Sequence, residues 1–281
     1  MKTIMFPGQG AQYKGMGRSL FPKYRQLVKE ASTVLGYCIE ELCINDPENK
    51  LDQTQFTQPA IYVVNAMAYE DHIKTTQKPA SFFVGHSLGE YNSLLAAQSF
   101  DFETGLKLVQ EQGKIMSKVR GGGMLAVMGT RIDTIKSLLE KHHITEIDIA
   151  SYNTPTQIIL SGLKENIQSV ERLFSAQKIQ CISLNVSAPF HSRYMREAEA
   201  EFEQFLKKFN FTPPKIPVIA NVTARPYKDT DVPELLARQI SCSIQWTDSI
   251  RYLMSQENMT FVGMGEYPIL NRMLKEIQEA K

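Results

Sequence analysis

The arrangement of residues 81–98 constrains the fold more than any other part of the sequence. A short apolar run at 81–84 leads directly into Gly-His-Ser-Leu-Gly at 85–89, and helical periodicity follows at 91–98. Glycines on both sides of a serine allow the backbone to fold back sharply between a strand and a helix. A buried strand that turns at once into a helix is typical of a parallel α/β sheet. The segment therefore predicts an α/β fold with Ser87 exposed at the turn.

The start of the chain has a related pattern. An apolar run at 3–6 ends in Pro-Gly-Gln-Gly at 7–10, which predicts a buried strand followed by a glycine-rich loop. The other elements expected around this sheet are helices at 17–35, 57–74, 102–119 and 192–208, and strands at 217–221 and 261–263.

Three glycines at 121–123 begin a part of the chain with a different order of elements. Apolar patterns predict strand, helix, strand, strand, helix and strand at 124–128, 132–142, 146–150, 157–161, 164–177 and 179–186. The order βαββαβ is ferredoxin-like. We therefore predict a large α/β-hydrolase-like domain with a parallel sheet at 1–121 and 190–281, and an inserted ferredoxin-like small domain at 122–189.

Composition narrows the functional classes. The 31 basic and 30 acidic side chains are balanced, so the charge does not indicate nucleic-acid binding. No apolar stretch approaches the roughly 20 residues that span a bilayer. The apolar part of the first residues is short, so a signal peptide is not expected there. We expect a cytoplasmic protein with no membrane partner. The four cysteines are scattered (Cys38, Cys43, Cys181, Cys242), which predicts reduced thiols and no metal site.

A serine nucleophile needs a base, and the sequence contains five histidines. Those at 72, 142 and 143 lie in polar helical segments, where a solvated position is expected. His86 adjoins Ser87, and its geometry favours a packing or orienting role. His191 follows an irregular stretch at the return from the small domain, which favours it as the base. From these residues alone, a purely structural role for His191 stays open.

Several motifs in correct order together resemble the malonyl-CoA:acyl carrier protein transacylase family. They are Pro-Gly-Gln-Gly-Ala-Gln at 7–12, Gly-His-Ser-Leu-Gly-Glu at 85–90, Asn153 with Gln157, Ala-Pro-Phe-His-Ser at 188–192, Asn221, and Gln-Trp-Thr at 245–247. The resemblance extends from residue 5 to about residue 275. The segments at 54–60 and 100–105 are most similar to the free-standing acyltransferases of trans-acyltransferase polyketide synthases.

The resemblance implies a role for each matching residue. Ser87 would form an acyl-enzyme, and His191 would shuttle the proton. The main-chain amides of Gln9 and Leu88 would form the oxyanion hole. Asn221 and the main-chain carbonyl near Gln245 would orient His191 in place of a carboxylate. The remaining implied substrate-binding residues are Met116, Phe190, Asn153 and Gln157.

One position departs from the family pattern. Members that use malonyl groups carry an arginine in an Arg-Gly-x-x-Met segment, whereas this chain has Gln112 followed by Gly113 and Met116. Arginine would hold the free carboxylate of malonate with two parallel charged hydrogen bonds, and glutamine has neither the charge nor the fork. Two nearby cations could replace the arginine, but Lys114 lies roughly 200° around the helix from Gln112, and Arg120 lies about two turns further on, beside the glycines at 121–123. We therefore expect Gln112 to contact the acyl group and malonyl-CoA to be a poor substrate.

These observations favour a serine-dependent hydrolase that removes acyl groups from carrier proteins in trans-acyltransferase polyketide biosynthesis, a role that the resemblance makes plausible. The alternative is a transacylase that loads a carrier protein from malonyl-CoA or another acyl-CoA. In both cases the partners are an acyl carrier protein and an acyl thioester. Phosphopantetheine arrives on the carrier or as CoA, and no other cofactor is expected. We expect the protein to act as a monomer.

Two other hypotheses are weaker. An α/β-hydrolase esterase usually supplies its histidine last in chain order, yet no histidine follows His191. A carrier-binding subunit without activity would not be expected to retain Ser87, His191, Gln9 and Asn221 together.

Overall fold

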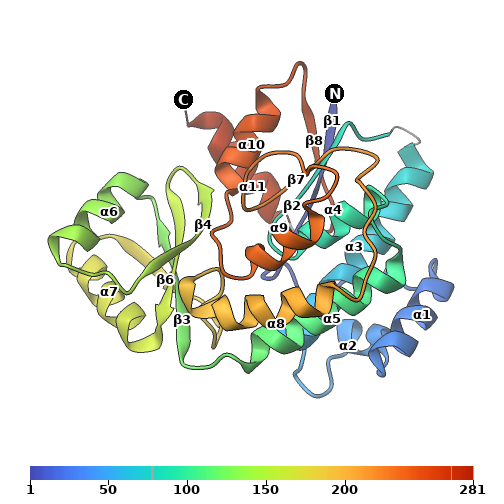
Figure 1. Cartoon of the computed structure of the whole chain (residues 1–281), viewed down its shortest axis with the longest axis horizontal. Coiled ribbons are helices and arrows are strands. Elements are labelled where there is room, and N and C mark those ends of the chain that lie inside the picture. The colour runs from blue at the N-terminus through green and yellow to red at the C-terminus, as the bar shows by residue number, and fades with distance from the viewer. Residues whose placement is uncertain (77–78, 267, 281) are drawn as a thin grey trace.

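The larger domain is built on a parallel sheet. The computed structural model describes residues 1–76, 79–266 and 268–280 (Figure 1). Four strands pair in the order β7-β2-β1-β8, all in parallel. Their bounds are Lys2–Phe6 for β1, Phe82–Gly85 for β2, Val218–Ile219 for β7 and Thr260–Gly263 for β8. The parallel α/β sheet predicted from the sequence is confirmed.

Side chains along the central strands alternate between two layers of helices. Ile4 and Phe83 belong to the core formed with α3, α4 and α5. Met5 and Val84 point to the opposite layer and pack with residues of α10 and α11. These helices are α3 (Thr54–Thr76), α4 (Gly89–Ala96), α5 (Phe102–Lys118), α10 (Trp246–Met254) and α11 (Ile269–Glu279). Because both faces are covered, the strands read as continuous apolar runs.

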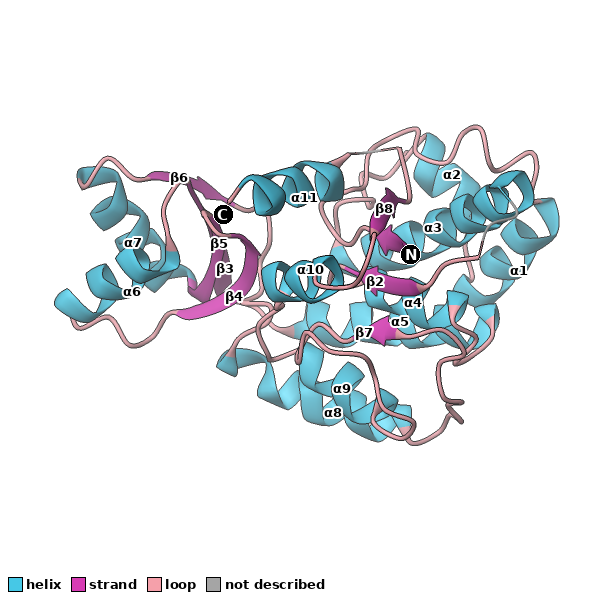
Figure 2. Ribbon diagram, turned by 90° about the horizontal axis from the view of Figure 1, so that it is seen from above, coloured by secondary structure: helices cyan, strands magenta, loops and turns pink. Residues whose placement is uncertain are grey.

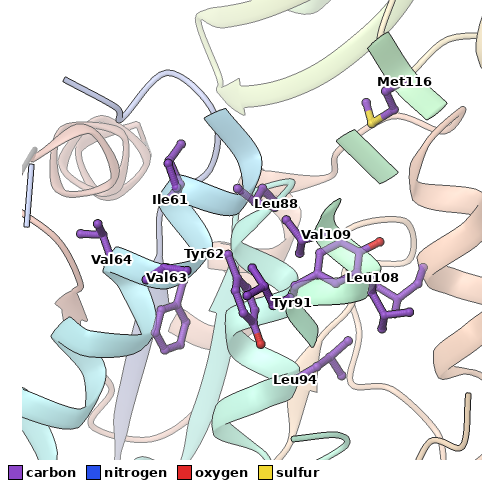
Figure 3. Packing of buried hydrophobic residues seen from close by; sticks show 14 of the residues in the cluster. Ile61, Tyr62, Val63, Val64, Leu88, Tyr91, Leu94, Leu108, Val109 and Met116 are labelled. Atoms are coloured by element: carbon purple, nitrogen blue, oxygen red, sulfur yellow. The ribbon is translucent and has the colours of Figure 1, made fainter. Parts of the chain in front are cut away.

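Helix α4, which follows Ser87, is buried between its neighbours. Figure 3 shows Leu88, Tyr91 and Leu94 among side chains of α3 and α5, and all three are fully buried. The remaining helices of this domain are α1 (Arg25–Leu35), α2 (Ile39–Ile44), a 3-10 turn (Arg193–Met195), α8 (Arg196–Leu206) and α9 (Val232–Gln239). Packing on every side therefore fixes the position of the N-terminus of α4.

The small domain has the predicted ferredoxin-like order. Its elements are β3 (Gly122–Met128), α6 (Ile132–Lys141), β4 (Asp148–Thr154), β5 (Gln157–Leu163), α7 (Lys164–Ala176) and β6 (Gln180–Ser183). The strands form an antiparallel sheet in the order β4-β5-β3-β6. Its own core packs the two helices against one face of that sheet.

Main-chain hydrogen bonds connect the two domains both where the chain passes between them and at a separate edge of the small domain. The Gly122 N–H donates to the Ser187 carbonyl at 3.1 Å, so the chain segments that enter and leave the small domain lie side by side. On the other edge, Tyr152 N–H donates to the Ile244 carbonyl and Ile244 N–H donates to the Ala150 carbonyl. Figure 2 shows α10 and α11 between the two sheets. The boundaries at 122 and 189 stay a prediction, but the contacts hold the small domain against the large one.

Two helices are shorter than their periodicity predicted. The pattern at 17–35 becomes a helix only from Arg25, because Gly17 adopts φ +73° and the chain turns repeatedly before that point. The pattern at 192–208 begins as the 3-10 turn and ends at Leu206. Among the described residues, no helix combines the length and apolar character that crossing a membrane requires.

The crossing between the domains yields a test with a matched control. A Cβ built on Gly122 would overlap the Pro189 ring, whereas one on Gly123 would lie 3.6 Å from Ile167, an ordinary contact. We expect Gly122→Ala to lower the free energy of unfolding by about 1–3 kcal/mol. Gly123→Ala should leave it unchanged or raise it by up to about 1 kcal/mol. Urea denaturation measures both, and equal effects of the two variants would contradict this account.

Candidate active site

Ser87 lies in a sharp turn at residues 85–89, here called the elbow, between β2 and α4. The serine has φ +50°, a left-handed conformation that residues other than glycine rarely adopt. A Cβ on Gly85 would overlap the Gly89 carbonyl group, and a Cβ on Gly89 would overlap the Phe6 carbonyl. The motif therefore has glycine at both positions because main-chain atoms of β1 and of α4 approach too closely for a side chain.

Asn221 holds the elbow from the side. Its Oδ1 accepts the Ser87 N–H at 2.7 Å, and its Nδ2 donates to the Gly85 carbonyl at 2.6 Å. The side chain is 1% exposed, and it follows β7, the strand next to β2. One amide thus satisfies two main-chain groups that the sharp turn leaves without strand or helix partners.

His191 contacts the serine directly. Its Nε2 lies 2.9 Å from Ser87 Oγ, and its Nδ1 lies 2.7 Å from the Gln239 carbonyl. A carbonyl only accepts, so Nδ1 carries the proton and Nε2 is free to accept the Ser87 hydroxyl proton. His191 also has a left-handed backbone, with φ +56°. The two side chains have the geometry of a nucleophile and its base.

The expectation that Asn221 and the carbonyl near Gln245 orient His191 is wrong. Asn221 contacts the elbow, and the Gln245 carbonyl accepts the Ser249 N–H inside α10. The Gln245 N–H instead donates to the Asn221 carbonyl at 2.9 Å, which ties the start of α10 to the elbow's support. The carbonyl that orients His191 belongs to Gln239, at the end of α9.

Burial decides the charge of the histidines. It lowers the pKa of His191 to about 4, although the Gln239 carbonyl raises that pKa and the proximity of His86 lowers it further. Burial also lowers the pKa of His86, against a raising contribution from its hydrogen bond to Asn153. A histidine with a lowered pKa stays neutral at pH 7 and is therefore ready to accept a proton.

Two main-chain amides near Ser87 are available to an anion. Among the hydrogen bonds of the described residues, neither the Leu88 N–H nor the Gln9 N–H has an acceptor. Leu88 opens α4, where the helix dipole favours negative charge. A Cβ on Gly8 would overlap the His86 carbonyl and lie 3.3 Å from Leu88 N, so the loop at 7–10 packs directly on the elbow. The arrangement can act as an oxyanion hole.

A cavity of about 330 Å³ opens beside Ser87, between the two domains. Five of the predicted residues besides Ser87 and His191 line it: Gln9, Met116, Phe190, Asn153 and Gln157. Most of the other lining side chains are apolar, among them Met124, Ile159 and Met273. No Asp, Glu, Lys or Arg of the described residues lines this cavity. It therefore suits an acyl chain better than a charged group.

Gln112 does not line the cavity, contrary to the expectation. It is 1% exposed, accepts a hydrogen bond from the Tyr91 hydroxyl, and donates to Gln58 Oε1 at 3.4 Å. Gln58, which the sequence analysis did not identify, does line the cavity, and its Nε2 lies 3.5 Å from Met116 Sδ. Gln112 therefore lies behind the cavity wall and contacts Gln58, which lines the cavity, through neutral hydrogen-bonding groups.

The small domain contributes polar groups to the opposite wall. Asn153 Oδ1 lies 2.8 Å from His86 Nε2 and accepts the Ser151 hydroxyl at 2.6 Å. The His86 ring also packs edge-on against Trp246, with ring centres 5.2 Å apart. His86 therefore joins the elbow to the small domain, which agrees with the orienting role expected for it.

The lowered pKa of His191 predicts the pH at which its own ring takes up a proton. Because burial lowers the pKa of His191 to about 4, the ring should stay neutral from pH 8 down to about 5, whereas an ordinary histidine titrates near pH 6.5. NMR chemical shifts of the His191 ring, assigned by their loss in His191→Gln, follow this titration. A midpoint near 6.5 in protein that circular dichroism shows to be folded would contradict the assignment.

Known proteins are similar to this chain in sequence and fold. The "Acyl transferase domain" family model matches residues 3–280. The chain is 46% identical over 281 residues to "Polyketide biosynthesis malonyl CoA-acyl carrier protein transacylase PksC" of Bacillus subtilis (strain 168), covering 99% of this chain and 98% of that protein.

Solved structures agree with that match. The malonyl CoA-acyl carrier protein transacylase of Burkholderia pseudomallei superposes with a TM-score of 0.98 at 43% identity, covering 100% of this chain and 99% of the other. A malonyl-transacylase in complex with its type II PKS acyl-carrier protein (PlMCAT:AntF) has a TM-score of 0.93 at 28% identity, covering 98% and 92%. Sequence, fold and site geometry together place this chain in the acyl transferase domain family.

Proposed function

We propose that this protein transfers acyl groups between thioesters through an acyl-Ser87 intermediate, with an acyl carrier protein of a polyketide synthase as the acceptor. The observation that carries the proposal is the Ser87–His191 hydrogen bond at the mouth of an apolar cavity beside two unoccupied main-chain amides. The relatives named as transacylases of polyketide biosynthesis support the choice of acceptor.

The first half of the reaction follows from the geometry. Ser87 Oγ attacks the thioester carbonyl carbon while His191 Nε2 takes the hydroxyl proton. The amides of Leu88 and Gln9 stabilise the carbonyl oxygen as it becomes negative. The carbon–sulfur bond then breaks, and the departing sulfur takes the proton from His191. The Gln239 carbonyl stabilises the charged imidazole in between, since it accepts from Nδ1.

The second half repeats these steps with a new nucleophile. The phosphopantetheine thiol of the carrier gives its proton to His191 and attacks the acyl-Ser87 carbonyl. The bond from that carbon to Ser87 Oγ then breaks, His191 returns the proton to the serine oxygen, and a thioester forms. The same site can use water, which releases a free acid. Transfer is the reaction that the names of the relatives favour.

Hydrolysis is the second candidate, and the uncharged cavity favours it. Gln58 lines the cavity and is backed by Gln112 and Tyr91, so the groups are neutral where malonate would need a cation. A site of this kind suits acetyl and longer uncharged chains, which are the groups that a hydrolase would clear from carrier proteins. The acyl specificity and the acceptor are therefore separate questions, and one assay can answer both.

The assay follows the intact mass of a carrier protein. Wild-type protein is added to a carrier loaded with acetyl, a longer acyl or a malonyl group, and separately to an unloaded holo-carrier with the matching acyl-CoA. Charging of the holo-carrier supports transfer, whereas loss of acyl groups from loaded carriers without charging identifies a hydrolase. Ser87→Ala should lower either rate by roughly 10⁴-fold. An unchanged rate in that variant would exclude Ser87 as the nucleophile.

A pair of substitutions at Gln112 tests the origin of acyl selectivity. Gln112→Arg places a cation behind Gln58, so the ratio of malonyl to acetyl transfer should rise roughly tenfold to a hundredfold. Gln112→Met has a similar size and no charge, and its ratio should stay within about threefold of the wild type. Initial rates of Ser87 acylation by the two CoA esters give the ratio. An equal rise in both variants would show that charge is not the cause.

A further inference from the structure

Glu90 is a buried carboxylate close to the reacting pair. It lies in the first turn of α4, three residues after Ser87, and is 1% exposed. Three groups donate to it: the Asn221 N–H at 2.9 Å and the Tyr227 hydroxyl at 2.6 Å on Oε1, and the Gln239 amide on Oε2. All three donors are neutral. A buried carboxylate without a cationic partner is costly, so its presence calls for a functional reason.

Two of these donors also hold the reacting residues. Asn221 accepts the Ser87 N–H with its side chain while donating its own N–H to Glu90. The Gln239 Nε2 donates to Glu90 and, at 3.1 Å, to the Ser87 carbonyl. The main-chain carbonyl of the same Gln239 orients His191. Both peptide groups of Ser87 and the far nitrogen of His191 are thus connected to one carboxylate through two residues.

We propose that Glu90 is a positioning residue that fixes Ser87 and His191 relative to one another through Asn221 and Gln239. This inference rests on the proposed function in one respect, namely that Ser87 and His191 are the reacting pair. Glu90 does not contact the substrate cavity, because it is absent from the residues that line it. Glu90 instead sets the distance and angle between the Ser87 hydroxyl and the His191 ring.

The chemistry of the network requires an acceptor at position 90. Gln239 faces Glu90 and the Ser87 carbonyl, and both accept, so its amide nitrogen must point to them. In Glu90→Gln the new amide nitrogen would face a donor in either orientation, the Gln239 amide group in one and the Asn221 N–H in the other. If the Gln239 amide turned over to relieve the first clash, its oxygen would face the Ser87 carbonyl. Each arrangement disturbs one of the two connections to Ser87 while volume is preserved.

The titration of Glu90 fits this environment. Burial raises its pKa to about 7, although the hydrogen bonds from Tyr227, Asn221 and Gln239 lower that pKa. The titratable side chains beside it are Tyr91 and Tyr227, whose own pKa values are raised well above the usual range by burial and then by Glu90. Both tyrosines are therefore neutral donors at any pH used in an assay.

Glu90→Gln and Tyr227→Phe form the test, measured on the full chain. Glu90→Gln should lower kcat for acyl transfer roughly tenfold to a hundredfold and leave KM within about threefold, since misplacement affects the reaction and not binding. The rate of Ser87 labelling by a fluorophosphonate should fall by a similar factor. Tyr227→Phe removes one donor but keeps both connections to the reacting pair, so its loss should stay below about threefold.

Other outcomes overturn the proposal. Glu90→Gln with kcat and labelling within threefold of the wild type would do so. A loss of activity in Glu90→Gln that parallels thermal unfolding of the variant and disappears at lower temperature would also overturn it. If Glu90→Gln does not fold, Gln239→Met breaks the link between Glu90 and Ser87 but keeps the carbonyl for His191, and unchanged kcat there also contradicts the proposal. If wild-type protein is labelled at Ser87 but transfers no acyl group, the proposed function is refuted. The rates of Ser87 labelling in the wild type and in Glu90→Gln then still decide the role of Glu90.

Discussion

The site depends on main-chain atoms of three segments approaching more closely than any side chain permits. Gly85 and Gly89 bring the end of β2 against the start of α4, and Gly8 brings the first loop onto both. This contact places free amides on each side of Ser87 and puts the serine at the tip of the turn. The parallel sheet below and the buried helix above keep the three segments in place. The residues that line the cavity, including those of the small domain, surround this contact between the first loop, β2 and α4.

Much of the fold could be predicted because its signals are local. The strand, turn and helix around Ser87 and the βαββαβ order after Gly121 follow from apolar periodicity and glycine placement. The exceptions have physical causes. The pattern at 17–24 is apolar because Phe21 and Tyr24 pack into the core, but left-handed Gly17 and Pro22, which has no N–H to donate, interrupt a helix there. Apolar periodicity in a sequence indicates which side chains are buried, but buried side chains can also belong to turns.

The site could be predicted only where side-chain type carries the chemistry. Ser87 and His191 were identified because a nucleophile and a base need those residues. The partner of His191 was not, because Gln239 acts through its main-chain carbonyl, which every residue type possesses. Gln58 lines the cavity and Gln112 lies one layer behind it, and this difference escapes prediction for another reason. A helix period tells which face a residue occupies, but not which of two stacked glutamines reaches the cavity.

Ser87 and His191 share left-handed backbones, at φ +50° and +56°. Glycine and asparagine hold that conformation at lower cost than serine or histidine. At both positions, therefore, the residue that does the chemistry is not the one that best suits the chain. Replacing either residue by glycine would relieve backbone strain and abolish the reaction, so the strain is part of how the fold holds the nucleophile and its base.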